Sequence, residues 1–425
     1  MKSIMGEQKP RKFFYGWVVF ALCFMMIFCV LGFCSSAKSL FLAPITEDLG
    51  ISRSLFSIAD SVRYVTTAVV NIFFGFLIVR WRPRKMVAFG FVALIAFALI
   101  TSFAKNLAGF YLGGFFLGIG LSWTTTSLVG YVVEKWFTKS KGTIMGFILA
   151  ANGLGAALAS QIFSPILNSR SDGWRLAYRV SAIVVASCGV LVVLFLRNTP
   201  EELGLEPLGR DKVAKAKRGN SWKGISLKEA SKKSYFYLAA ACVFLTGLIL
   251  QSSGGISSAH MKDCGIDPAF IATCLSIHSV TLACAKLFTG FFFDKSGLSS
   301  TMLFCGVCTV IATAVLALVS NNSMAMIYSI LESFAAPLET IMIPLIVLDL
   351  FGSESYAKIL GLFISFNTAG YALGAPLVNS IFDLTGSYKS ILLILSALSA
   401  LVMVLMQFCI AKAHKLAKDL EKEEQ

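Results

Sequence analysis

The segment Gly75-Phe-Leu-Ile-Val-Arg80 returns 215 residues further along the chain as Gly290-Phe-Phe-Phe-Asp294-Lys295. The same spacing relates distant positions throughout the sequence: Gly50 and Gly265, Glu134 and Asp349, Gly146 and Gly361, Asn152 and Asn367, Gly155 and Gly370. One constant spacing over such distances indicates two halves with the same layout. In a chain that is mostly membrane-spanning, two like halves are typical of secondary transporters.

The composition is that of a membrane protein. The chain is 56% hydrophobic and 14% charged, whereas soluble domains carry about 25% charged residues. The net charge of +14 does not indicate nucleic acid as a partner, because the basic residues crowd the short connections between apolar runs and no nucleic-acid motif is visible. Membrane lipid is the expected surrounding.

Twelve apolar stretches are long enough to cross a bilayer. They run approximately over 14–38, 54–78, 86–104, 107–133, 142–167, 174–196, 235–260, 269–293, 300–319, 323–349, 357–382 and 388–411. Helices are expected, because lipid offers no partner to an unpaired backbone group. The predicted fold class is therefore an all-α membrane protein with twelve transmembrane helices in two pseudo-symmetric six-helix bundles.

The distribution of lysine and arginine predicts the orientation. Most basic residues fall on one side when the N-terminus is placed in the cytoplasm, so both termini are predicted to be cytoplasmic, in a multi-pass protein of the cell membrane. Residues 1–200 are expected to form the N-terminal bundle, 201–233 a cytoplasmic linker, and 234–425 the C-terminal bundle with a cytoplasmic tail. We expect a monomer.

The sequence favours neither an enzyme nor a cofactor-dependent protein. No Walker A loop is present, so ATP-driven transport by this chain alone is not expected. Its three histidines are scattered and do not form a metal site or a nucleophile–base set. We expect no cofactor and no metal.

Both copies of the opening segment resemble the cytoplasmic signature loop of the major facilitator superfamily. The gating loops expected from this resemblance contain Gly75, Arg80, Arg84, Gly290, Asp294 and Lys295. Val79 stands where the first copy usually carries an aspartate that helps to latch the halves. The resemblance therefore predicts a latch in the second copy and leaves the first open.

Further segments resemble the monocarboxylate transporter and oxalate/formate antiporter branch of that superfamily. They are Tyr15-Gly16-Trp17, Lys38-Ser39, Trp136-Phe137, Gly173-Trp174-Arg175, Gly374-Ala375-Pro376-Leu377 and Phe382-Asp383. The resemblance runs from the first span to the last and implies a carrier of small monocarboxylates.

Ionisable residues inside the spans are the functional candidates, because each is costly in lipid unless it is paired or faces water. They are Lys38, Asp60, Arg63, His260, His278, Lys286, Glu332 and Glu339. Arg63 and His278 are related by the repeat, and Lys38 and His260 nearly so. Basic groups placed symmetrically about a central cavity would suit an anion.

Lys286 is the leading candidate for substrate binding. It lies four residues before Gly290, where the branch usually carries an arginine that holds the substrate carboxylate. A lysine keeps the charge and loses the bidentate fork. The alternative is a lysine that extends toward the membrane surface.

Lys38 and Arg63 are expected to assist. Lys38 resembles an outer lysine of the branch that is proposed as a substrate or proton relay, and its alternative is an interfacial anchor. Arg63 lies three residues after Asp60 on one helix face, so the pair could instead form an internal salt bridge.

Proton coupling is assigned to His278, Glu339 and Asp60 as candidates. In the branch an aspartate one turn before the eighth-span arginine carries the proton, and here that position is Leu282. Glu339 could take its place or could simply neutralise Lys286. His278 could instead be a hydrogen-bonded packing residue.

Asn152, Asn367 and Thr125 are predicted to line the cavity and to supply directional contacts. The threonine could instead bond back to its own helix, and the asparagines could join helices. The sequence thus predicts a secondary transporter of small organic anions, by proton symport or anion exchange. A proton-coupled exporter of cationic or lipophilic compounds is the alternative.

Overall fold

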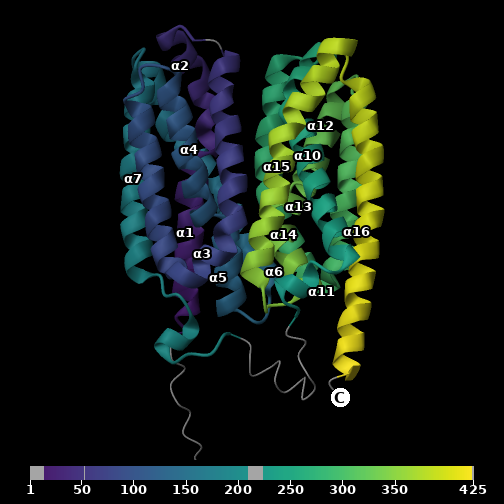
Figure 1. The fold of residues 1–425 in the computed structure, drawn as a ribbon. Coiled ribbons are helices and arrows are strands. Elements are labelled where there is room, and N and C mark those ends of the chain that lie inside the picture. The colour runs from purple at the N-terminus through teal and green to yellow at the C-terminus, as the bar shows by residue number, and fades with distance from the viewer. Residues whose placement is uncertain (1–13, 52, 209–223, 424–425) are drawn as a thin grey trace, which may run out of the picture.

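The computed structural model describes residues 14–51, 53–208 and 224–423. The described part of the chain is a long bundle of helices, and Figure 1 shows its N-terminal half, purple to teal, beside its C-terminal half, green to yellow. The described parts of the linker, 201–208 and 224–233, and the end of the last helix lie at the same end of the bundle, at the bottom of that view. We call this end the linker face, and the sequence predicts it to be cytoplasmic.

The helices follow one another in the same order in both halves. The N-terminal half contains α1 (Gly16–Cys34), η1 (Ser36–Phe41), α2 (Leu42–Leu49), α3 (Arg53–Ser102), α4 (Leu107–Thr124), α5 (Thr126–Trp136), α6 (Lys141–Ser169), α7 (Gly173–Phe195) and η2 (Pro200–Leu203). The C-terminal half contains α9 (Leu227–Ala230), α10 (Ser234–Asp263), α11 (Pro268–Ala317), α12 (Asn322–Ala335), α13 (Pro337–Thr340), α14 (Met342–Phe351), α15 (Tyr356–Thr385) and α16 (Lys389–Glu423).

Two of these helices are double spans. Both α3 and α11 have 50 residues, about 75 Å of helix at ~1.5 Å per residue, far more than one bilayer needs. Each turns back at a residue with positive φ, Arg82 (63°) in α3 and Gly297 (77°) in α11. Arg82 precedes Pro83, which has no backbone N–H with which to continue the helix.

The tenth span is broken. The segments Asn322–Thr340 and Met342–Phe351 meet at an angle of 47°. Pro337 lies just before the bend, at the first position of α13, and it cannot donate the backbone hydrogen bond that would continue α12. With α3 and α11 counted twice and this bent pair once, the described residues contain twelve spans, which confirms the predicted fold class.

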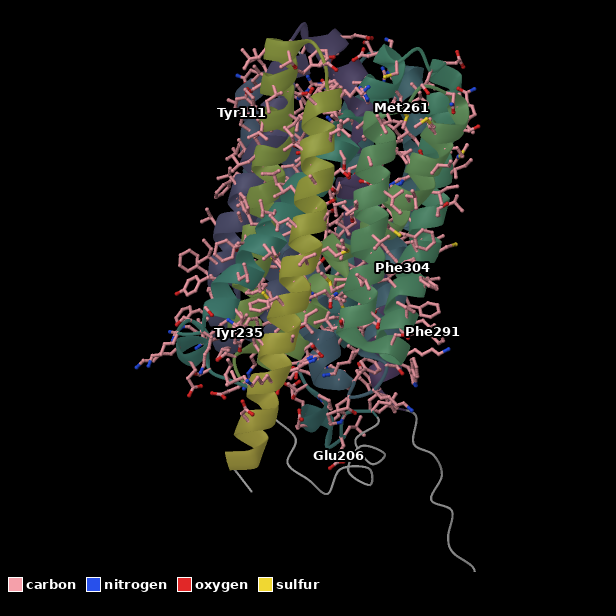
Figure 2. The ribbon with its side chains drawn as sticks, turned by 90° about the vertical axis from the view of Figure 1, so that its right-hand side faces the viewer. Tyr111, Glu206, Tyr235, Met261, Phe291 and Phe304 are labelled. Atoms are coloured by element: carbon pink, nitrogen blue, oxygen red, sulfur yellow. The ribbon has the colours of Figure 1, made fainter. Side chains whose placement is uncertain are left out.

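Large apolar side chains cover the outside of the bundle. Phe291, 57% exposed, lies on the outer surface of the C-terminal half, where Figure 2 labels it. Val65, Phe76 and Val280 are also more than half exposed. A soluble protein rarely exposes so much contiguous apolar surface, so this surface is suited to lipid.

The repeat produces the same contact twice where the two halves meet. A methyl group on Gly290 would collide with the backbone of Gly142, and one on Gly75 would collide with the backbone of Ala357 and, more closely, of Lys358. Gly142 and Ala357 are themselves 215 residues apart. The helix pairs α6–α11 and α3–α15 therefore cross the interface with the same geometry near the linker face.

The two helices α6 and α11 separate with distance from the linker face. A methyl group on Gly146 would lie 2.6 Å from the carbonyl oxygen of Lys286. On Gly153, two turns further along α6, it would lie 3.7 Å from the side chain of Ala283, an ordinary contact. The halves are thus pressed together on the linker side and spread apart beyond it.

One carboxylate fastens this closed end. Asp294, on α11, accepts hydrogen bonds from the backbone N–H groups of Gly142 (3.0 Å) and Thr143 (2.7 Å) and from the Thr143 hydroxyl (2.6 Å). Ser140, at the start of α6, makes no side-chain cap of its own. Asp294 therefore satisfies free N–H groups of α6 from the opposite half, at the positive end of the helix dipole.

Candidate functional site

A cavity of about 290 Å³ lies between the two halves, beyond the closed linker side. Its walls come from α1, α3, the break between α4 and α5, and α6 on one side, and from the tenth span and α15 on the other. The lining residues are Leu31, Ser35, Arg63, Tyr64, Thr67, Asn71, Leu121, Ser122, Thr125, Thr126, Ser127, Asn152, Glu339, Thr340, Ile364, Asn367, Thr368 and Tyr371.

Arg63 is the one cation among the described residues of this wall. Its Nη1 donates to the Ser35 hydroxyl at 2.9 Å, and its Nε lies 3.5 Å from Oδ1 of Asp60. The guanidinium also lies over the Tyr64 ring, 4.3 Å from the ring centroid. Arg63 and Asp60 form the internal salt bridge that the sequence offered as the alternative role. Arg63 also lines the cavity.

Glu339 and Thr340 face Arg63's half from the break in the tenth span. Oε1 of Glu339 and Oγ1 of Thr340 are buried and have no hydrogen-bond partner among the described residues. Buried polar atoms are nearly always paired with protein or with a bound molecule. Helix breaks near the membrane centre are the usual places where transporters present such groups.

The two repeat-related asparagines both line the cavity. Asn152 accepts a hydrogen bond from the Ser36 hydroxyl at 2.7 Å. Asn367 donates to the carbonyl oxygen of Val243 at 3.2 Å. Each asparagine therefore also joins its helix to a neighbouring element. Lining the cavity and joining helices are both seen for these residues.

Thr125 lines the cavity and also bonds back to its own helix. Its hydroxyl donates to the carbonyl oxygen of Leu121 at 2.6 Å. The hydroxyl oxygen keeps its lone pairs and can accept a hydrogen bond from the cavity. Thr125 is therefore placed as an acceptor.

Lys286 is buried, 5% exposed, and lies outside the set of residues that line the cavity. Its Nζ donates to the carbonyl oxygen of Leu149 at 3.4 Å. No ion pair of 4.0 Å or less joins it to an acid in the described part of the chain, although Glu339 is near enough to interact with it electrostatically. Its repeat counterpart, Asn71, does line the cavity. Substrate contact by Lys286 stays a prediction.

The remaining cations are placed elsewhere. Nδ1 of His278 lies 3.0 Å from the Ser333 hydroxyl and 3.2 Å from the Ser329 carbonyl oxygen, so His278 joins α11 to α12. Nε2 of His260 lies 3.1 Å from the carbonyl oxygen of Leu316. Neither histidine is among the residues that line the cavity. Lys38 belongs to η1, and its side chain lies outside the described residues.

The gating-loop residues lie where the halves meet at the linker face. Arg84 donates from Nε to the carbonyl oxygen of Val193, at 2.5 Å, and fastens the turn of α3 to α7. Arg80 and Lys295 are exposed. Val79 is 69% exposed and supplies no counterpart to the Asp294 carboxylate.

Sequence reasoning missed most residues of the wall, among them Tyr64, Asn71, Thr340 and Tyr371. The rings of Tyr64 and Tyr371 come from opposite halves and meet edge to face, with centroids 5.9 Å apart. Asn71 is the repeat counterpart of Lys286, and that relation could have found it. The tyrosines carried no signal, because aromatic residues are common throughout the spans.

Comparison with known proteins agrees with this architecture. The sequence model of the Major Facilitator Superfamily matches residues 22–257 and 239–425. The crystal structure of the transporter FucP in the outward conformation superimposes with a TM-score of 0.71, at 14% identity, over 93% of this chain and 99% of that one. The xylose–proton symporter XylE gives 0.71 at 14% identity, over 94% and 97%. These likenesses show the fold.

Three curated relatives share sequence with the chain. The sialic acid transporter NanX of Escherichia coli (strain K12) is 22% identical over 98% of both chains. Monocarboxylate transporter 2 of Homo sapiens is 20% identical over 92% of this chain and 84% of its own. The uncharacterised transporter YcxA of Bacillus subtilis (strain 168) is 28% identical, and the match spans 54% of this chain and 55% of YcxA. With a family match to both halves and a twelve-span fold, this chain is a transporter that belongs to the Major Facilitator Superfamily.

Proposed function

We propose that the protein is a secondary transporter of a small organic anion and that it moves the anion together with a proton. The observation that carries the proposal is the position of Arg63, a guanidinium held at the wall of the cavity between the halves. A guanidinium has five N–H donors, and those not used by Ser35 and Asp60 can bind a carboxylate. Arg63 thus takes the role that the sequence assigned first to Lys286.

The charges around the cavity favour symport. Asp60 and Arg63 form an ion pair, and Glu332 and Lys286 act on Glu339 with opposite signs. A bound monocarboxylate would add one negative charge in a site of low dielectric, which is costly. One proton on Glu339 would offset that added charge. We therefore assign Glu339 as the proton carrier that travels with the anion.

The alternating movement would start from the arrangement seen here. The linker side is closed by the glycine contacts of α6 with α11 and by Asp294, so in the predicted orientation the cavity is shut off from the cytoplasm. Opening there would require α6 and α11 to part, together with α3 and α15. In the outward-open state the anion and the proton would enter from outside.

The named relatives support an anion. Their names refer to sialic acid, monocarboxylates and, in a match over 36% of this chain, nitrite. The alternative is a cationic substrate that binds Glu339, and the unpartnered Oε1 of that residue favours it. Arg63 opposes this alternative, because it would repel a cation in the same cavity.

Uptake into proteoliposomes tests the proposal. Labelled lactate, pyruvate, formate and a six-carbon carboxylate are offered with an inward proton gradient, without a gradient, and with unlabelled anion inside. We expect uptake driven by the proton gradient and its loss in Arg63→Gln, with wild-type uptake in Lys105→Gln, an exposed lysine outside the cavity. In Glu339→Gln we expect exchange of internal for external anion to persist and proton-driven uptake to stop.

Other outcomes would contradict specific parts of the proposal. Uptake driven only by internal anion would replace symport with exchange. Indifference to every carboxylate, combined with uptake of an organic cation, would overturn the anion proposal and favour the cationic alternative.

A further inference from the structure

We propose that the anion for which this cavity is built is a polyhydroxylated carboxylate of sugar-acid type, and that unsubstituted short or aliphatic carboxylates are poor substrates. The inference rests on the proposed function, because it takes the anion at Arg63 as given. It is carried by the hydrogen-bonding chemistry of the remaining wall.

Fifteen of the eighteen residues that line the cavity carry a polar side-chain atom. Only three of the residues that line the cavity have wholly apolar side chains: Leu31, Leu121 and Ile364. Ligand pockets are in general lined mostly by hydrophobic and aromatic side chains with a few polar groups. The alkyl part of a simple carboxylate could pack on the apolar atoms of this wall, but it would displace water from the hydroxyl and amide groups without replacing their hydrogen bonds.

Four of the hydroxyls at this wall can only accept. The hydrogens of Thr125, Ser122 and Thr368 are already donated to backbone carbonyl oxygens of their own helices, at 2.6, 2.8 and 2.8 Å. Ser127 donates to Oδ1 of Asn71 at 2.7 Å. Each oxygen is left with lone pairs and without a hydrogen to offer. A matching ligand must therefore bring several O–H or N–H donors of its own.

Two polar atoms of the opposite wall are also open to a ligand: Glu339 can accept a hydrogen bond, and the Thr340 hydroxyl can accept or donate one. Oε1 of Glu339 and Oγ1 of Thr340 are buried without a partner in the described part of the chain. They lie at the break of the tenth span, in the half opposite Arg63. A molecule with a carboxylate at one end and hydroxyls along the rest would satisfy both walls. Acetate or formate would satisfy only the Arg63 side.

The size of the cavity and the charges near it further narrow the class of substrate. The cavity volume of about 290 Å³ is near the lower end of ligand pockets, about 300 Å³, which suits a six-carbon acid better than a one- or two-carbon acid. An ammonium group would also donate hydrogen bonds. It would, however, add a second positive charge to a cavity that already holds Arg63 and has Lys286 beside it. Hydroxyls supply the donors without that repulsion.

Four six-carbon probes separate these possibilities in proteoliposomes with an inward proton gradient. D-gluconate has a carboxylate and hydroxyls, hexanoate has the carboxylate alone, 6-aminohexanoate adds one ammonium, and sorbitol has hydroxyls without the carboxylate. We expect D-gluconate to be taken up at least tenfold faster than each of the other three, and to compete with labelled lactate if lactate is carried at all.

Two variants test the role of the accepting hydroxyls. Thr125→Val and Thr368→Val keep the shape of the side chain and remove the acceptor, and we expect each to lower D-gluconate uptake about tenfold. Thr313→Val is the matched control, because Thr313 bonds back to its own helix in the same way, at 2.7 Å, and is buried away from the cavity. It should transport like the wild type.

The results that would overturn this inference differ from those that would overturn the proposed function. Hexanoate or acetate carried as well as D-gluconate, or valine variants with unchanged D-gluconate uptake, would overturn this inference and leave the anion transporter standing. Preference for 6-aminohexanoate would replace the hydroxylated acid with a zwitterion. Transport of sorbitol at the rate of D-gluconate, or of no carboxylate at all, would overturn the proposed function itself.

Discussion

Asp294 on α11 accepts two hydrogen bonds from Thr143 on α6, one from its backbone N–H at 2.7 Å and one from its hydroxyl at 2.6 Å. The two residues belong to different halves of the protein. The contact therefore has to break whenever the halves part at the linker face. It contributes to the stability of this closed arrangement and is absent from any state that opens here.

We call the hydrogen bonds from Gly142 and Thr143 to Asp294 the latch. Its removal should shift the conformational equilibrium away from the observed state, which is closed at the linker face. In Asp294→Ala the first N–H groups of α6 lose a charged acceptor, an interaction worth about 1.5–3 kcal/mol for a hydrogen bond to a charged group. We expect the outer ends of the halves to approach one another. Spin labels at Lys105→Cys and Ser320→Cys, which are related by the repeat and exposed, would report this as a shorter mean distance.

The exposed Cys264 and Cys284 are replaced by serine in this measurement, so that only the introduced cysteines react. Lys415→Ala, at an exposed position of α16 outside the gating loops, serves as the control and should leave the label distance unchanged. An unchanged distance in Asp294→Ala as well would show that Asp294 does not hold the closed state.

A second latch can be installed. Val79 is related to Asp294 by the repeat, and Ala357 and Lys358 at the start of α15 are related to Gly142 and Thr143. We expect Val79→Asp to accept hydrogen bonds from the start of α15, with Lys358 adding attraction. The closed state would be stabilised and turnover would slow several-fold.

The distance between the same two spin labels measures the effect of Val79→Asp. Val79→Asn, whose side chain has no charge, is the control for the effect of the charge. Faster uptake in Val79→Asp, or a shorter label distance than in the wild type, would mean that the two halves do not use this position equivalently.

Close approach of α6 to α11 depends on Gly146. A methyl group there would lie 2.6 Å from the carbonyl oxygen of Lys286, which is far inside van der Waals contact. We expect Gly146→Ala to cost the closed state about 1–3 kcal/mol, the usual range for overpacking. This would reduce the closed population and lower uptake at least fivefold.

Gly153→Ala is the matched control, because its methyl group would lie 3.7 Å from Ala283 in an ordinary contact. It should transport like the wild type. Equal loss in both variants would mean that helix flexibility, and not the close contact at the linker side, explains the effect.

Lys286 is predicted to be essential although it does not line the cavity in this state. Its positive charge acts on Glu339, so its removal would change the charge balance beside the proposed proton carrier and impair coupling. We expect Lys286→Ala to abolish proton-driven uptake while the protein is still inserted and folded, as judged by its gel-filtration profile. Normal transport by this variant would remove Lys286 from the mechanism.

Much of the architecture could be predicted from the sequence. Spans are visible because lipid demands long apolar runs, and the halves are visible because one spacing relates Gly75 to Gly290 and Gly146 to Gly361. The predicted spans and the family resemblance are confirmed. The division of the chain at 201–233 and the cytoplasmic position of both termini remain predictions. Residues 1–13, 209–223 and 424–425 lie outside the described part.

The site itself could be predicted only as a set of candidates. The sequence lists every ionisable residue within a span, because hydropathy marks each one as an exception. It does not say which way a side chain points. Hydropathy alone does not distinguish Arg63, His278 and Lys286 from one another. Packing decided among them: Arg63 faces the cavity, His278 joins two helices of its own half, and Lys286 bonds to α6.

The sequence by itself determined the helices, their number and their repetition, because these follow from local hydrophobicity and from spacing along the chain. The tertiary structure alone decided which polar groups share one cavity, because that depends on the rotation of each helix about its axis and on the bend at Pro337 that brings Glu339 to the wall. A rotation of half a turn moves a side chain from the cavity to the lipid, and the hydropathy of the whole span does not change.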